Sequence, residues 1–238
     1  MVHSPDESGD FAAIAGAVSI NVGTLSGPWV EGMHKAVDAC EAHAKPWVLD
    51  PVGMGATPFR SAETVRLALR RPTVVRGNAS EIKALYAACA ERQGGVAGKG
   101  VDATHSSAEA VGDAGALARL LGCVVACTGE VDYVTDGTRT AEVHNGSPLQ
   151  TKVTAAGCSL SSVVAAYLAA RPGDPLLATA HAVTAYNMAG DVAAQDQPGP
   201  GTFRVRFVDA LYEIAEVGGH NIVRGFWDSP EGPVLRLP

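Results

Sequence analysis

The sequence has few aromatic residues and little positive charge. Aromatic residues make up 5% of the 238 positions, charged residues 18%, and the formal net charge is −7. No run of basic residues is present, which argues against a nucleic-acid partner. Hydrophobic residues account for 47% of the chain, which is enough for a sizeable core, and the length suits one large domain. A ligand that carries phosphate would need local positive charge from a metal ion, an arginine or a helix end.

Cysteine is too sparse and too irregular for a disulfide framework or a zinc site. The number of cysteines is odd and no Cys-x-x-Cys pair occurs; the five are Cys40, Cys89, Cys123, Cys127 and Cys158. We therefore expect a reducing, cytoplasmic setting. The first residues, MVHSPDESGDF, are acidic and lack the apolar segment of a signal peptide. No apolar run approaches the length that spans a membrane.

The common short motifs of nucleotide and hydrolase chemistry are also missing. Gly98-Lys99-Gly100 lacks the Ser or Thr of a P-loop, and no Gly-x-Gly-x-x-Gly follows a predicted strand. Gly-x-Ser-x-Gly is absent, which weakens a serine-hydrolase hypothesis. The seven histidines are scattered without the spacing of metal ligands.

Short apolar runs alternate with helix-forming stretches along most of the chain. We predict strands at 17–22, 47–49, 73–75 and 123–127, and a hairpin from 133–135 and 140–143. We predict helices at 7–15, 29–44, 61–70, 81–90, 108–121, 159–170, 174–195 and 207–217. Residues 91–107 read as a Gly-rich loop and 218–238 as an irregular tail. The alternation is typical of one α/β domain, residues 1–217, whose mostly parallel sheet is covered on both faces.

Polar clusters follow four of the predicted strands. They are Asn21–Thr24, Asp50–Gly53, Arg76–Asn78 and Thr128–Glu130. The carboxyl ends of parallel strands share one edge of a sheet, where α/β proteins bind ligands. We therefore predict a functional site at this edge.

Four polar residues in these clusters or close after them have both a structural and a functional interpretation. Asp50 is either a turn residue or a carboxylate ligand for magnesium, and Glu81 is either a capping partner or a second carboxylate near that metal. Arg76 is a surface charge or a phosphate clamp. Thr128 caps a turn or contacts a nucleotide.

A run of small residues, Lys152–Ser161, leads into the predicted helix that ends before Arg171-Pro172-Gly173. The unpaired N–H groups of a helix N-terminus favour phosphate, and small residues let a ligand approach the backbone. Cys158 stands at this helix entrance, where a thiol can act chemically. The alternative is that Cys158 is a small buried side chain and that the alanines serve packing.

Seven segments in order resemble one known family, the hydroxyethylthiazole kinases. The segments are INVGTL (Ile20–Leu25), WVLDPVGMGATPFR (Trp47–Arg60), VVRGNASEI (Val74–Ile82), KGVDA (Lys99–Ala103), TGEVDYVTDG (Thr128–Gly137), TKVTAAGCSLS (Thr151–Ser161) and GPGTFRVRFVDALY (Gly199–Tyr212). The resemblance extends from Met1 to about Val217.

The resemblance implies a ribokinase-like, three-layer α/β/α fold. It implies transfer of phosphate from ATP, with magnesium, to the hydroxyl of 4-methyl-5-(2-hydroxyethyl)thiazole in thiamine biosynthesis, by a homotrimer with its sites between subunits. By position it assigns Arg76 and Thr128 to ATP, Asp50 and Glu81 to the surroundings of magnesium, Met1 and Ala155 to the thiazole, and Cys158 to catalysis.

The sequence departs from the family at two places. Ala155 replaces a common glycine, so we expect the backbone there to avoid positive φ, or the pocket to be slightly smaller. Family members also begin earlier, and their first strand and helix have no counterpart here. Either the start lies upstream, or the chain is truncated and loses part of its sheet and substrate pocket.

Two alternative functions follow from these departures and from the fold. One is an inactive, truncated subunit that assembles with full-length partners. The other is a ribokinase-like dehydratase that acts on hydrated nicotinamide cofactors, although the seven segments fit that class poorly.

Overall fold

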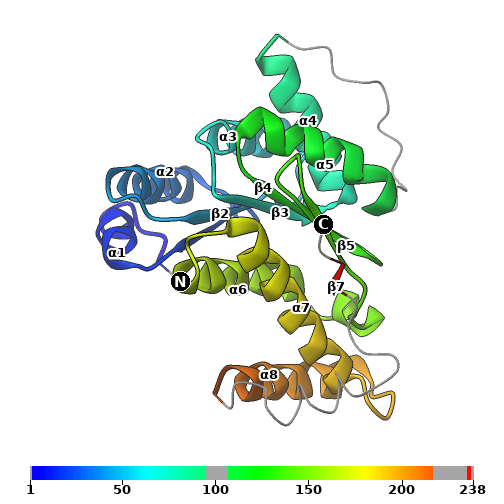
Figure 1. Ribbon diagram of the computed structural model, residues 1–238. Coiled ribbons are helices and arrows are strands. Elements are labelled where there is room, and N and C mark those ends of the chain that lie inside the picture. Colours follow the sequence, from blue (N-terminus) through cyan, green and yellow to red (C-terminus); the bar gives the residue numbers. More distant parts are fainter. Residues whose placement is uncertain (1, 95–106, 217–234, 237–238) are drawn as a thin grey trace.

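The computed structural model describes residues 2–94, 107–216 and 235–236, and Figure 1 shows a sheet between two layers of helices. In these residues the sheet has seven strands in chain order: β1 (Val18–Asn21), β2 (Trp47–Asp50), β3 (Val74–Asn78), β4 (Val124–Thr128), β5 (Asp132–Thr135), β6 (Thr140–Val143) and β7 (Leu235–Arg236). The first four strands are parallel, and β5, β6 and β7 each run antiparallel to their predecessor. The predicted three-layer α/β/α fold is confirmed.

Side chains of the strands alternate between two cores, one on each face of the sheet. Leu49, Val75 and Val125 pack in the core beneath α2 (Gly27–Ala42), α3 (Pro58–Ala68), α4 (Ala79–Arg92) and α5 (Ser107–Leu121). Val48 and Val74 pack in the opposite core with α6 (Ala156–Ala170), α7 (Pro175–Ala193) and α8 (Pro200–Glu216). The short helix α1 (Ser8–Ile14) lies beside α2. Burial of both faces explains why the central strands read as continuous apolar runs.

Two sequence predictions need correction. Helix α8 begins at Pro200 rather than near Phe207, because proline is tolerated in the first turn of a helix, where its missing N–H costs nothing. The tail is not wholly irregular, since Leu235 and Arg236 form β7 along β6. Helix α4 extends to Arg92, and most of the predicted loop, residues 95–106, lies outside the described residues.

None of the described helices is long and apolar enough to cross a membrane.

The strand register brings the polar clusters to one edge. Asn21 pairs with Asp50 across β1 and β2, and Asn78 pairs with Thr128 across β3 and β4. These positions are the last residues of their strands, so the predicted edge exists.

The residue that starts α6 adopts an unusual backbone conformation. Ala155, the N-cap residue, has φ of +66° and makes no side-chain capping bond. The expectation that alanine would avoid positive φ is therefore wrong: the chain keeps the left-handed conformation that glycine prefers, although a Cβ is present. Such a conformation costs a residue with a Cβ about 1–2 kcal/mol, so surrounding contacts must enforce it.

Ala155→Gly should stabilise the protein, because glycine adopts this φ without the steric cost of Cβ. We expect the free energy of unfolding to rise by about 1 kcal/mol in urea denaturation. Ala156→Gly is the matched control: the next residue is not at positive φ, and glycine there should destabilise by roughly 0.5–1 kcal/mol. If the free energy of unfolding fell equally in both variants, the backbone at Ala155 would not be strained.

Candidate functional site

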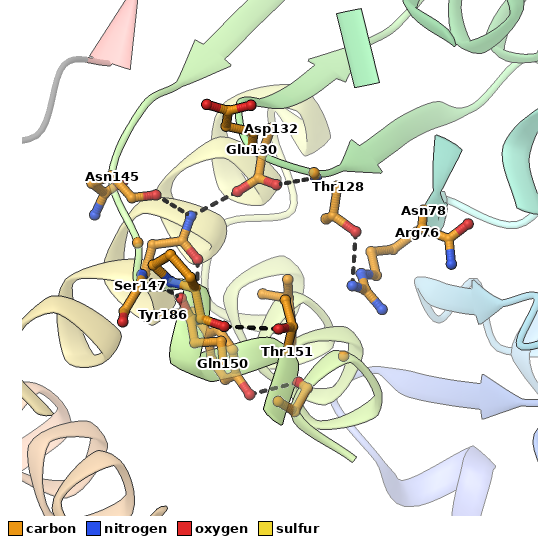
Figure 2. A pocket seen from close by; sticks show the side chains of 17 residues that line it. Arg76, Asn78, Thr128, Glu130, Asp132, Asn145, Ser147, Gln150, Thr151 and Tyr186 are labelled. Carbon is orange, nitrogen blue, oxygen red and sulfur yellow. Dashed lines mark hydrogen bonds between the residues drawn. The ribbon is translucent and has the colours of Figure 1, made fainter. Parts of the chain in front are cut away.

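A cavity of about 580 Å³ opens at the carboxyl ends of β3 and β4. The other walls come from the segment around the 3₁₀ helix η1 (Pro148–Lys152), the first turns of α6, and α7 (Figure 2). Its lining residues include Arg76, Asn78, Thr128, Gly129, Asp132, Asn145, Gln150, Gly157, Tyr186 and Asn187. This size and place suit a small-molecule ligand.

Arg76 supplies a guanidinium at the floor of this cavity. Its Nη2 donates to Thr128 Oγ1 at 2.8 Å, and its buried Nε has no partner among the described residues. A Cβ on Gly157 would lie 2.7 Å from Nη1, so a larger residue there would push the guanidinium away from the start of α6. The arginine is therefore held between β4 and the α6 N-terminus.

Asp50 lies beside this arginine and is 1% exposed. Its Oδ2 accepts from Asn21 Nδ2 and from Ser161 Oγ, both at 2.9 Å, and lies 3.9 Å from Arg76 Nη1. Burial raises the pKa of Asp50 to about 6, against the opposing effect of Arg76. Its Oδ1 is buried and has no hydrogen-bond partner in the described residues. One carboxylate oxygen is thus unsatisfied.

Glu81 serves as the capping partner of α4. Its Oε2 accepts from Asn78 N while Asn78 Oδ1 accepts from Glu81 N, which forms a capping box. Its Oε1 accepts from Gly53 N at 2.9 Å. The charge of Glu81 also contributes to the raised pKa of Asp50, so the two carboxylates lie within electrostatic range of each other.

The positive end of α6 faces the same corner as Arg76. Ala156 and Gly157 line the cavity, and the first N–H groups of a helix have no intrahelical acceptor. Cys158 in the next position is half-buried, whereas the four other cysteines are buried. A helix terminus and a guanidinium together favour a bound anion.

The predicted site residues fall into three groups. Arg76 and Thr128 line the cavity. Asp50 and Glu81 are not among the lining residues: Asp50 lies next to Arg76, and Glu81 lies in the first turn of α4. Ala155 and Cys158 adjoin the lining residues Ala156 and Gly157. Met1 lies outside the described residues.

A buried polar network on the opposite wall was missed by the sequence analysis. Asn187 Nδ2 donates to Asp132 Oδ2 at 2.7 Å and to Asn145 O at 2.9 Å, while Gln150 Nε2 donates to Asn187 Oδ1 (Figure 2). Burial raises the pKa of Asp132, although Gly129 N–H and Asn187 donate to it. The available signal was the pair of polar side chains, Tyr186 and Asn187, inside the apolar sequence of α7.

Comparisons with known proteins agree on one family. A profile of the hydroxyethylthiazole kinase family matches residues 1–217. A hydroxyethylthiazole kinase of Cereibacter sphaeroides is 51% identical over 215 residues, which cover 90% of this chain and 79% of that protein. One from Escherichia coli O81 is 47% identical, with 91% of this chain and 80% of the relative covered.

A solved structure is similar over the whole chain. The hydroxyethylthiazole kinase protein of Pyrococcus horikoshii superposes with a TM-score of 0.83 at 35% identity, covering 100% of this chain and 83% of that one. A pyridoxal kinase of Bacillus subtilis, at 24% identity and a TM-score of 0.50, shares the fold alone. The chain belongs to the hydroxyethylthiazole kinase family.

Proposed function

We propose that the chain transfers the γ-phosphoryl group of ATP to the hydroxyl of 4-methyl-5-(2-hydroxyethyl)thiazole, a step of thiamine biosynthesis or salvage. The observation that carries this proposal is the meeting of Arg76 with the N-terminus of α6 at one corner of the cavity. Two positive elements there complement the charge of a transferring phosphoryl group. Family membership identifies the alcohol that accepts it.

ATP would occupy the cavity between β4 and α7, with its phosphates toward Arg76 and Thr128. Because phosphoryl transfer needs little covalent chemistry from the protein, catalysis is mainly positioning and charge stabilisation. The N–H groups of Gly157 and Cys158 would face the oxygens of the transferred group. The thiazole would lie near Ala155, and Met1 would contribute to its binding.

The carboxylates at this edge fit a magnesium ion. No group of three or more His, Cys, Asp or Glu is assembled for a metal in the described residues, but Asp50 Oδ1 is a buried oxygen without a partner. Magnesium commonly takes only one or two carboxylates and completes its shell with water and substrate phosphate. Asp50 would bind the ion and Glu81 would add negative charge beside it. When bound, the ion would offset charge on the phosphates.

Cys158 would assist removal of the proton from the thiazole hydroxyl. It is half-buried in the first turn of α6, next to the N–H groups that would face the phosphoryl group. We also propose a homotrimer with the sites between subunits. Exposed apolar side chains compatible with subunit contact are Phe11 and Ile14 on α1 and Val205, Val208 and Tyr212 on α8.

The direct test of the proposed function is a coupled assay of ADP release. ADP should form from ATP only when both magnesium and the thiazole alcohol are present, and thiazole phosphate should be the product. Absence of turnover would contradict the proposal. Conversion of a hydrated nicotinamide cofactor instead would identify the chain as a dehydratase of the same fold.

Arg76→Lys should weaken ATP binding with little change in melting temperature, because lysine keeps the charge but loses the planar fork of donors. The measurements are the KM for ATP and thermal melting. Arg70→Lys is the matched control, since Arg70 forms ion pairs with Asp38 and Glu41 away from the cavity. A large drop in melting temperature with an unchanged KM for ATP would make Arg76 purely structural.

Asp50→Asn should change how stability depends on pH in metal-free protein. The folded-state pKa of Asp50 is raised to about 6, so the folded state holds a proton that the unfolded state releases near pH 4. The proton on the Asp50 carboxyl group therefore stabilises the folded state at low pH, and this stabilisation is lost as the pH rises through about 6. Asparagine does not titrate, so the free energy of unfolding of the variant, relative to wild type, should rise by about 2 kcal/mol from pH 4 to 7.

Urea denaturation in a chelating buffer measures this difference. Asp209→Asn, at an exposed position of α8, is the control and should follow the wild-type pH profile. Added magnesium should move the wild-type transition to lower pH and leave Asp50→Asn unaffected. If the free energy of unfolding changed with pH in the same way in wild type and Asp50→Asn, folding would not raise the pKa of Asp50, and this prediction would be wrong.

Cys158→Asp should retain or raise kcat, because a carboxylate is ionised at neutral pH and can accept the hydroxyl proton. Cys158→Ala should lower kcat modestly, and Cys158→Ser should resemble it, since positioning supplies most of the rate. The assay uses saturating ATP, with melting temperatures to verify folding. An inactive but folded Asp variant beside a fully active Ala variant would mean that Cys158 handles no proton.

A further inference from the structure

Tyr186 reaches from α7 to the first turn of α6. The residue is 2% exposed, and its ring packs edge-on against Phe207, with ring centroids 4.8 Å apart. It also lines the cavity (Figure 2). A buried tyrosine normally finds a partner for its hydroxyl, and here the partners lie at the start of the helix that faces the cavity.

The Tyr186 hydroxyl is tied to the backbone at the strained turn. It donates to Ala156 O at 2.6 Å and lies 2.7 Å from Ser159 Oγ. Ser159 Oγ is itself 3.0 Å from the carbonyl oxygens of both Ala155 and Ala156. Two side chains thus hold the two carbonyls that flank the start of α6, where Ala155 has positive φ.

Holding the Ala156 carbonyl also fixes an N–H group. The C=O of Ala156 and the N–H of Gly157 belong to one planar trans peptide and point in opposite directions. Gly157 in turn packs against the guanidinium of Arg76. The orientation of this one peptide therefore sets an N–H donor beside the guanidinium of Arg76.

We propose that Tyr186, acting with Ser159, is a positioning residue for phosphoryl transfer: it fixes the Ala156–Gly157 peptide so that the Gly157 N–H, beside Arg76, points at the transferring group. The proposal rests on the proposed function. Tyr186 does not touch the reacting atoms. Its contribution is to the barrier of the chemical step rather than to the binding of ATP.

Removing the hydroxyl should leave the fold intact. Ser159 Oγ can then donate its one hydrogen to Ala156 O, while Ala155 O keeps the backbone N–H of Ser159 as a donor, so neither carbonyl is left without a partner. The ring of Tyr186→Phe keeps its contact with Phe207. The effect of the variant can therefore be separated from a loss of folding.

The experiment measures steady-state kinetics of Tyr186→Phe with ATP and the thiazole alcohol. We expect kcat to fall on the order of tenfold, less than the loss of a whole oxyanion donor. Both KM values should stay within about twofold and the melting temperature near that of wild type, because neither substrate binding nor the core changes. Tyr167→Phe is the control: this tyrosine is on α6 itself, and its hydroxyl makes no hydrogen bond within the described residues, so kcat should be unchanged.

Ser159→Ala should also lower kcat, and the double variant should be little worse than the worse single variant, because the two hydroxyls hold one turn. An unchanged kcat in Tyr186→Phe, or a raised KM for ATP with kcat intact, would overturn the proposal.

A second readout does not depend on turnover. Amide hydrogen exchange at Gly157 and Cys158 should be faster in Tyr186→Phe than in wild type, and unchanged in Tyr167→Phe. Wild-type protein that does not phosphorylate the thiazole alcohol would refute the proposed function. Unchanged exchange at these amides would refute the positioning role of Tyr186 independently.

Discussion

The site depends on two positively charged elements that lie close together at the start of α6. The guanidinium of Arg76 lies against Gly157, where the helix presents its own positive end. Two like-signed elements repel each other unless an anion lies between or beside them. Asp50 is the nearest negative group that the structure describes; with a pKa of about 6 it is mostly ionised at neutral pH, and its single charge does not offset both the guanidinium and the helix terminus. A bound phosphate would complete the balance, which is why the corner favours a phosphorylated ligand.

Hydrogen bonds between elements of different layers keep these two positive elements close together. Asp50, at the end of β2, accepts from Asn21 on β1 and from Ser161 on α6, so one carboxylate ties the sheet to the helix below it. Ser161 is the partner most distant in sequence, 111 residues from Asp50. Tyr186 ties the same helix to α7. The first turn of α6 is therefore fixed from two sides, and this explains how Ala155 keeps a backbone conformation that alanine disfavours.

Sequence reasoning located the edge of the sheet but not the walls of the cavity. Polar residues after buried strands are sufficient to predict the edge, because parallel strands end together, and the Asn78–Glu81 spacing is sufficient to predict a capping box. The left-handed Ala155 could not be predicted, since local propensity opposes it and only contacts from α7 and within α6 enforce it. The network around Asn187 was missed for a related reason: its partner Asp132 lies 55 residues away, and only the folded chain places them together.

The measurement that tests this account most directly is the response of the Gly157 and Cys158 amides to nucleotides. In ¹H–¹⁵N spectra of labelled protein, both amide resonances should shift when a non-hydrolysable ATP analogue is added, and adenosine should leave them in place, because only the triphosphate reaches the α6 N-terminus. Shifts at Thr128 and Asn187 without any at Gly157 and Cys158 would show that nucleotide enters the cavity while its phosphates lie elsewhere. That result would contradict the central claim that Arg76 and the start of α6 together receive the transferring phosphoryl group.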